Sequence, residues 1–232
     1  MRNKKNKRGE LTTTQLVTII VLIVSFVIIL FFIFKLNFGE TTDQEICRNS
    51  VVLKEAPGDF TGTLDCKTKY VTIESEDKGE IMKVIADEMA SCWWQFGEGE
   101  INYGEGFTET NVHYAICSIV TFDEKVQEKI SEITYQEFYT FLQKENKTSS
   151  QTYLQYLYSK NTFDNLDDEE YFGFSLSDSI DTSQKYSIIT GIDMNLRILF
   201  IGNEDRVLNT FIIPTLETDS RLVDSKEFIT KA

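Results

Sequence analysis

The first strong pattern in the chain is a long apolar run near its beginning. Residues 16–34 read LVTIIVLIVSFVIILFFIF, nineteen residues with Thr18 and Ser25 as the only polar side chains and no charge. At about 1.5 Å per residue this run forms a helix of about 28 Å, close to the hydrocarbon thickness of a bilayer. A buried core helix, the alternative, would carry a polar stripe, and this run has none. The pattern predicts a transmembrane helix over residues 16–36, in contact with the lipid bilayer.

The charges on either side of this run predict its orientation. Five basic residues precede it: Arg2, Lys4, Lys5, Lys7 and Arg8. Only Lys35 follows it directly, and an excess of Lys and Arg marks the cytoplasmic side. We therefore expect a single-pass protein of the cell membrane, with a cytoplasmic tail at residues 1–15 and an extracytoplasmic C-terminal domain. A cleaved secretory signal would have a shorter apolar region followed by small residues, and residues 34–38 offer no such site.

Beyond the span, residues 37–46 are expected to form a linker and residues 47–232 the external domain. The clearest helix of this domain covers residues 81–96, where apolar residues recur at steps of three and four. Asp77 and Glu80 are placed for its N-terminal cap and Gly97 for its end. The adjacent Trp93 and Trp94 point about 100° apart, so both cannot face the core. We assign one to the core and mark Trp94 as a possible partner surface.

Two shorter helices are predicted further along the chain. Thr134 to Glu137 has the pattern of a capping box, and Ile133 and Phe138 are placed for a hydrophobic staple. Thr148 and Gln151 repeat the capping pattern before a second apolar stripe. The pattern predicts an αα-hairpin joined by residues 146–149. Asn146, in Asn-Lys-Thr, is also a possible glycosylation site, which agrees with an exposed loop outside the cell.

The remaining segments indicate strands. Short β-like runs occur at residues 51–53 and 70–73, and a longer one at 111–122. From residue 171 the apolar period changes to two, which predicts an antiparallel meander through runs at 172–176, 186–192, 196–201 and 211–213. The fold class that we expect is α+β: one N-terminal transmembrane helix, and an external domain of helices packed on one face of a mostly antiparallel sheet.

The chain contains four cysteines, and all of them lie in the predicted external part: Cys47, Cys66, Cys92 and Cys117. An even number of thiols on the oxidising side of a membrane predicts two disulfides, although sequence allows three pairings. We favour the local one, Cys47–Cys66 and Cys92–Cys117. The spacings and the single His113 make a zinc site a weak alternative.

Charge and composition exclude several functions. The 232 residues carry a net charge of −14, which argues against nucleic acid as a partner. Residues 1–37 contain six basic residues and one acid, which leaves 17 basic and 36 acidic residues and a charge of about −19 for the rest. We expect anionic lipid headgroups to repel such a domain, and we expect its acidic surface to be solvated. A single His makes a His-based catalytic centre improbable.

Three segments contain residues that could carry chemistry. His113 and Cys117 share a strand face about 13 Å apart, too far for a thiol–imidazole pair. A Gly-rich loop at 97–106 contains three Glu that would repel phosphate, and an acidic run at 164–170 lacks the ligand spacing of an EF-hand. We therefore predict no catalytic residue, no metal site and no cofactor, and expect the protein not to be an enzyme.

Two resemblances bear on the N-terminus and on the domain. Arg8-Gly9-Glu10-Leu11, directly before the apolar run, resembles the processing site of archaeal pilin-type (class III) signals. The resemblance implies a cut between Gly9 and Glu10 and an apolar helix that becomes a filament core. Cys92-Trp-Trp-Gln-Phe-Gly-Glu-Gly99, together with Tyr-Ala-Ile-Cys117, is similar to a group of single-span archaeal membrane proteins, and this resemblance implies no activity.

The leading hypothesis is a non-enzymatic membrane-anchored protein that displays an acidic disulfide-bonded domain for binding a protein partner or for self-assembly. One alternative is an archaeal type IV pilin-like filament subunit cleaved after Gly9. A second is an ectoenzyme of unknown class, which would need a convergent polar pocket that the sequence does not reveal.

Overall fold

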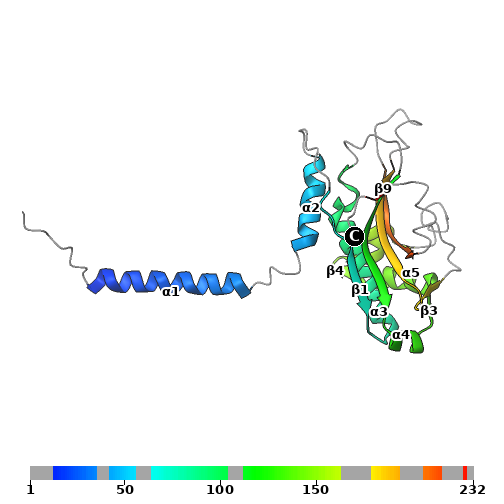
Figure 1. The fold of residues 1–232 in the computed structure, drawn as a ribbon, viewed down its shortest axis with the longest axis horizontal. Coiled ribbons are helices and arrows are strands. Elements are labelled where there is room, and N and C mark those ends of the chain that lie inside the picture. The colour runs from blue at the N-terminus through cyan, green and yellow to red at the C-terminus, as the bar shows by residue number, and fades with distance from the viewer. Residues whose placement is uncertain are drawn as a thin grey trace, which may run out of the picture. The chain divides into compact units, whose positions relative to one another are not determined.

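The computed structural model describes residues 13–35, 42–55, 64–103, 112–162, 179–193, 206–215 and 227–228. The chain divides into two compact units, residues 1–42 and residues 43–232. Helix α1 belongs to the first unit, and the described strands and the helices from α2 onward form the second (Figure 1).

Helix α1 spans Thr13–Lys35 and therefore includes the apolar run at residues 16–34. The side chains described on it, residues 15–28, are all exposed. The hydroxyl of Ser25 donates to the carbonyl of Val21 at 2.8 Å, which satisfies this polar group within the helix itself. Among the described residues, no helix combines the length and the apolar content that a bilayer crossing requires. The transmembrane assignment of residues 16–36 stays a prediction.

The second unit is built on a five-stranded sheet. Its path runs through β1 (Lys69–Ile73), β2 (Val112–Phe122), β7 (Tyr186–Asp193) and β8 (Arg206–Pro214), and β9 (Glu227–Phe228) pairs with the beginning of β2. The β2–β7 and β7–β8 pairs are antiparallel, whereas β1 and β9 run parallel to β2. A parallel β1–β2 pair is possible because helix α3 connects the two strands.

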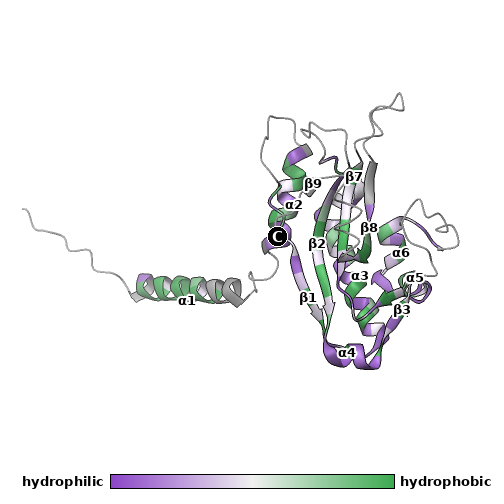
Figure 2. Ribbon diagram, turned by 45° about the vertical axis from the view of Figure 1, so that its right-hand side comes forward, coloured by the Kyte–Doolittle hydropathy of each residue, from purple (hydrophilic) through white to green (hydrophobic). Residues whose placement is uncertain are grey.

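Helices α3 (Lys78–Gln95), α5 (Tyr135–Lys144) and α6 (Tyr153–Tyr158) lie on one side of this sheet (Figure 2). Their apolar side chains form one core with the facing strands: Ile81, Ile85, Met89, Phe138, Leu142, Leu154, Leu157, Ile188 and Ile192 are fully buried in it. On the opposite face, Ile189 and Ile213 are buried beside Tyr114, Ile116 and Phe211. The α+β class with a mostly antiparallel sheet is confirmed.

Helix α3 begins and ends as its sequence predicts. The Asp77 carboxylate accepts a hydrogen bond from the backbone N–H of Glu80 at 3.0 Å, the expected N-terminal cap. At the other end Gly97 has a φ of +82°, a left-handed conformation that favours glycine and ends the helix. The short 3₁₀ helix η1 (Gly97–Gly99) follows.

Both disulfides are present, with the pairing favoured from the sequence. Cys92–Cys117 joins α3 to β2 across the core, with the Cα atoms 5.5 Å apart. Cys47–Cys66 joins α2 to the segment that leads into β1, with the Cα atoms 4.4 Å apart. No cysteine is free. Each bridge therefore connects one helix either to a strand of the sheet or to the segment that precedes its first strand.

The prediction of a strand at residues 51–53 was wrong. These residues belong to helix α2 (Thr42–Glu55), which also begins inside the predicted linker at 37–46. Asp43 and Glu45 in the first turn and Lys54 in the last favour the helix through its dipole. Cys47 and Val51, one turn apart, are both fully buried, so packing of one helix face outweighs the β propensity of a short apolar run.

The predicted pair of short helices is present, but the second begins later than expected. Helix α5 has the capping box of Thr134 and Glu137. The second box is formed by Thr152 and Gln155, not by Thr148 and Gln151. The predicted pair lies instead in a β-hairpin, β4 (Asn146–Thr148) and β5 (Gln151–Thr152), in which Thr148 pairs with Gln151. The hairpin delays the start of α6 by four residues.

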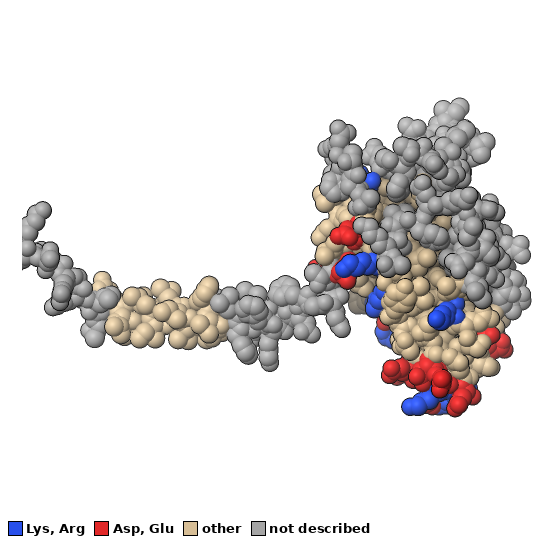
Figure 3. Space-filling model, viewed as in Figure 1, with Lys and Arg blue, Asp and Glu red and all other residues tan. Residues whose placement is uncertain are grey.

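Short elements complete the described part of the domain. Strand β3 (Glu132–Thr134) pairs with β6 (Ser179–Asp181), and helix α4 (Glu124–Lys129) precedes β3. Acidic and basic side chains gather together at the end of the domain that carries α4 (Figure 3), where Lys129 pairs with Glu76 at 3.1 Å. The predicted runs at 172–176 and 196–201, and the acidic run at 164–170, lie outside the described residues.

Candidate functional site

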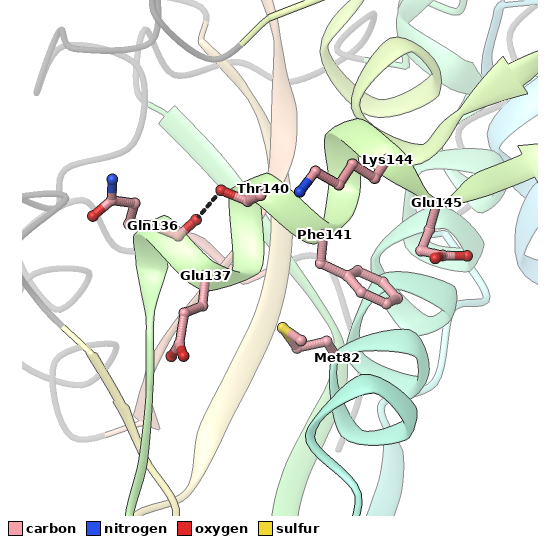
Figure 4. Close-up of a pocket in the computed structure, with 7 residues that line it drawn as sticks. All are labelled: Met82, Gln136, Glu137, Thr140, Phe141, Lys144 and Glu145. Carbon is pink, nitrogen blue, oxygen red and sulfur yellow. Dashed lines mark hydrogen bonds between the residues drawn. The ribbon is translucent and has the colours of Figure 1, made fainter.

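One surface cavity of the described part of the domain is an open groove between helices α3 and α5, with a volume of about 470 Å³. Phe141 and Met82 project into the same space, and Lys144 lies at the rim (Figure 4). We call this the α3–α5 groove; its lining residues are Met82, Gln136, Glu137, Thr140, Phe141, Lys144 and Glu145. It combines an apolar floor with a polar rim, the composition of a ligand or peptide site.

The capping box of α5 positions one wall of the groove. The Glu137 carboxylate accepts a hydrogen bond from the Thr134 backbone N–H at 3.0 Å and pairs with Lys78 at 3.2 Å. The Thr134 bond and the Lys78 bond hold the pKa of Glu137 below its usual value. Glu137 is therefore an ionised and partnered carboxylate at neutral pH, and it is not poised to donate a proton.

A polar group that we call the Asp87 cluster contacts the groove residue Phe141 through Tyr153, and it consists of Asp87, Lys83, Lys147 and Tyr153. The Asp87 carboxylate is 2.7 Å from the Lys83 ammonium and 3.3 Å from that of Lys147, and it accepts a 2.5 Å hydrogen bond from the Tyr153 hydroxyl. Burial acts to raise the Asp87 pKa, but the hydrogen bonds from Lys83 and Tyr153 and the positive charges of Lys147 and Lys83 together outweigh burial and lower the pKa. Burial and the bond to Asp87 raise the pKa of Tyr153, so the phenol stays protonated.

The Asp87 cluster supports the floor of the groove. The ring of Tyr153 stacks on that of Phe141, with the ring centroids 6.4 Å apart. The Lys147 ammonium lies 5.6 Å from the centroid of the Tyr153 ring, within reach of a cation–π interaction. Because Tyr153 contacts Phe141 on one side and Asp87 on the other, the cluster fixes the position of the aromatic floor.

A second polar group, the Arg48 cluster, consists of Arg48, Trp94, Glu98 and Tyr156. The guanidinium of Arg48, from α2, lies over the Trp94 ring at 4.6 Å and donates to the Trp94 carbonyl. It also pairs with Glu98 at 3.3 Å, while the Tyr156 hydroxyl of α6 donates to the same carboxylate at 2.7 Å. These contacts tie α2, η1 and α6 together.

The backbone of η1 depends on its glycines. Glu98 has a φ of +58°, between Gly97 at +82° and Gly99 at +79°. A Cβ atom at Gly99 would approach the Trp93 ring to 2.9 Å. The sequence therefore needs glycine on both sides of Glu98 to turn its carboxylate toward Arg48.

The titratable groups described above have a defined charge at neutral pH. Asp87 and Glu137 stay ionised and Tyr153 stays protonated at neutral pH, so none of them is tuned for proton transfer. Within the described ranges, no group of three or more His, Cys, Asp or Glu side chains could hold a metal ion. Cys117 is bonded to Cys92, which removes it as a partner for the buried His113.

The structure describes some of the site residues predicted from sequence, and others lie outside the described part of the chain. Trp93 is a core residue, 7% exposed, whereas Trp94 is half-buried and carries Arg48 on its ring. Asn146 is exposed in β4. Gly9 and Glu10 lie outside the described residues, so the predicted processing site stays a prediction.

Sequence reasoning missed the α3–α5 groove and both polar clusters. Their members come from segments far apart in the chain, since Asp87 meets Tyr153 across 66 positions and Arg48 meets Glu98 across 50. One signal was available: the glycines on both sides of Glu98 indicate a special backbone there. Nothing comparable marks Lys147 or Tyr156.

No family model matches the chain, and no curated protein or solved structure is significantly similar to it.

Proposed function

We propose that the protein is a non-enzymatic, single-pass membrane protein that displays an acidic, disulfide-bonded domain outside the cell for binding or assembly. The observation that carries the proposal is the position of the two disulfides. Both lie in the domain that follows an apolar helix with a basic N-terminal flank. Disulfides persist in oxidising compartments, and a basic flank marks the cytoplasmic side, so both features support the same topology.

The anchor is supported by the character of α1. Residues 16–34 carry no charge and are apolar on every side of the helix, and the described side chains of α1 are exposed. Lipid solvates such a surface, and a helix satisfies its own backbone hydrogen bonds there. The proposal therefore assigns residues 16–36 to the bilayer and residues 1–15 to the cytoplasm.

We assign the binding activity to the α3–α5 groove and its occupant to a segment of a partner protein. Phe141 and Met82 give the groove an apolar floor, which favours an apolar side chain of the partner. At the rim, Lys78 already pairs with Glu137, and the exposed side chains of Lys144 and Glu145 present one charge of each sign. A charge of about −19 on the chain beyond residue 37 attracts basic partners. The segment that fits best carries a basic residue beside an apolar one.

A photo-crosslinking amino acid at Gln136, on the groove rim, tests this assignment in intact cells. The matched control carries the same amino acid at Glu128, an exposed position of α4 outside the groove lining. We expect an adduct with one protein at position 136, none at 128, and loss of the adduct when Glu145→Lys reverses the rim charge. Equal adducts at both positions, or an adduct that Glu145→Lys leaves unchanged, would contradict the groove as the binding site.

The filament alternative is favoured by one observation, the Arg8-Gly9-Glu10-Leu11 sequence directly before the apolar run. In that case α1 would leave the bilayer after cleavage and pack against other copies of itself. Mass spectrometry of the native N-terminus separates the two proposals. A chain that starts at Glu10 supports the filament subunit, and an intact basic tail supports the membrane anchor.

A further inference from the structure

The hairpin of β4 and β5 holds the Asn146 side chain on its solvent-exposed face. Along β4 the side chains alternate: Asn146 and Thr148 are exposed, and Lys147 between them is half-buried. The Lys147 ammonium reaches the Asp87 carboxylate at 3.3 Å, which holds this strand face toward the domain. Because side chains alternate along a strand, the same contact turns Asn146 and Thr148 away from it.

The hairpin is also separate from the main sheet. Strands β4 and β5 form a two-stranded sheet of their own, in which Asn146 pairs with Thr152. The hairpin ends where the backbone N–H of Tyr153 donates to the Glu145 carbonyl at 3.1 Å. Short two-stranded hairpins open at low free energy, so this segment can enter an enzyme's site while the five-stranded sheet stays intact.

Asn146-Lys147-Thr148 is the single Asn-X-Ser/Thr sequence in the 232 residues. We propose that Asn146 is a modification site that carries an N-linked glycan on the outer side of the membrane. The inference rests on the proposed function, because glycan transfer to this sequence takes place outside the cytoplasm. The exposed Asn146 side chain accepts a sugar without displacing a buried group.

The transfer requires a lipid-linked sugar phosphate as its second substrate. The amide nitrogen of Asn146 forms a bond to the anomeric carbon of the sugar, while the bond from that carbon to the phosphate oxygen breaks. The lipid phosphate leaves with the electron pair of that bond, and the amide nitrogen loses one proton to a base. The product glycan begins one residue beyond Glu145, at the end of the α3–α5 groove.

The test uses full-length protein purified from native membranes and peptide mapping by mass spectrometry. We expect the peptide that contains Asn146 to carry a hexose- or hexosamine-based mass, and enzymatic or chemical release to remove it. Asn146→Gln and Thr148→Ala should each abolish the modification. Thr148→Ser keeps a hydroxyl in the sequon and should retain it, and Ser150→Ala, two residues further along the exposed turn, serves as the matched control.

Alkylation of the same preparation without reductant separates failure of this inference from failure of the proposed function. An unmodified Asn146 in a chain whose four cysteines resist alkylation would overturn the glycan alone. An unmodified Asn146 in a chain with reactive thiols would overturn the glycan and the external location together. A glycan that persists in Thr148→Ala would overturn the assignment of the site.

Discussion

Asp87 illustrates how single residues hold this domain together. Its carboxylate receives the Lys83 and Lys147 ammonium groups and the Tyr153 hydroxyl, and Tyr153 in turn supports Phe141 at the groove floor. A carboxylate with several donors is stabilised in its charged form, which is why its pKa is lowered in spite of partial burial.

Replacement of this carboxylate should destabilise the protein in a pH-dependent way. Asp87→Asn should lower the free energy of unfolding by about 1 kcal/mol at neutral pH, because the site is half-exposed and solvent weakens its ion pairs. A carboxyl group whose pKa is lower in the folded than in the unfolded protein stabilises the fold at pH values above its unfolded pKa. This contribution is lost as the pH falls through the folded pKa. The difference from wild type should therefore start to shrink as the pH falls below about 4, and it should disappear only below the folded pKa.

Denaturant unfolding of the full-length protein at pH 7 and pH 3 measures this effect. Asp43→Asn is the matched control, since its carboxylate pairs with Lys67 at 3.0 Å but both side chains are 62% exposed. We expect the control to change stability far less. Equal losses in the two variants, or a loss at Asp87 that is as large at pH 3 as at pH 7, would argue against a stabilising role of the Asp87 cluster.

Residue-level prediction succeeded where the interaction is local. The cap of Asp77, the capping box of Thr134 with Glu137 and the stop at Gly97 each involve positions three or four apart, and each is confirmed. The Asp87 and Arg48 clusters depend on contacts between distant segments. Composition and periodicity carry no information on which charged residue of one helix meets which residue of another.

Helix α2 is joined to the rest of the domain by a disulfide as well as by packing. It contributes Cys47 and Val51 to the core and Arg48 to the surface of Trp94, but Ile46, Val52 and Leu53 on its outer side are exposed. The bridge from Cys47 to Cys66 and the Arg48 cluster are thus the main described contacts that hold this helix. The prediction of a strand at residues 51–53 was wrong because the buried face of α2 depends on its packing against the rest of the domain, which the sequence pattern does not show.

Removal of the two bridges should have different local effects. Cys47→Ser with Cys66→Ser opens a loop of 19 residues and should lower the free energy of unfolding by about 3 kcal/mol on the chain-entropy model. Hydrogen exchange should then rise in α2 and stay slow in α3. Cys92→Ser with Cys117→Ser serves as the comparison and should speed exchange in α3 and β2. If α2 stays fully protected in the first variant, the bridge is not what holds it.

At the scale of the molecule, the helix and strand periods predicted the α+β class with a mostly antiparallel sheet. The cysteine pairing that is present is the local one, which we favoured among the three pairings that the sequence allowed. The order of the strands was not predictable in the same way. Strand β1 runs parallel to β2 and β9 returns to pair with the beginning of β2, and both pairings join segments far apart in the chain. The α3–α5 groove arises from the same long-range packing.

The central claim concerns topology, and one labelling experiment tests it directly. A membrane-impermeant amine reagent added to sealed cells should modify Lys125 and Lys129, which are exposed on α4, and should spare Lys4, Lys5 and Lys7 in the basic tail. After lysis the same reagent should modify both sets. Labelling of the tail lysines in sealed cells, with Lys125 and Lys129 modified only after lysis, would show that the domain faces the cytoplasm and would contradict the account.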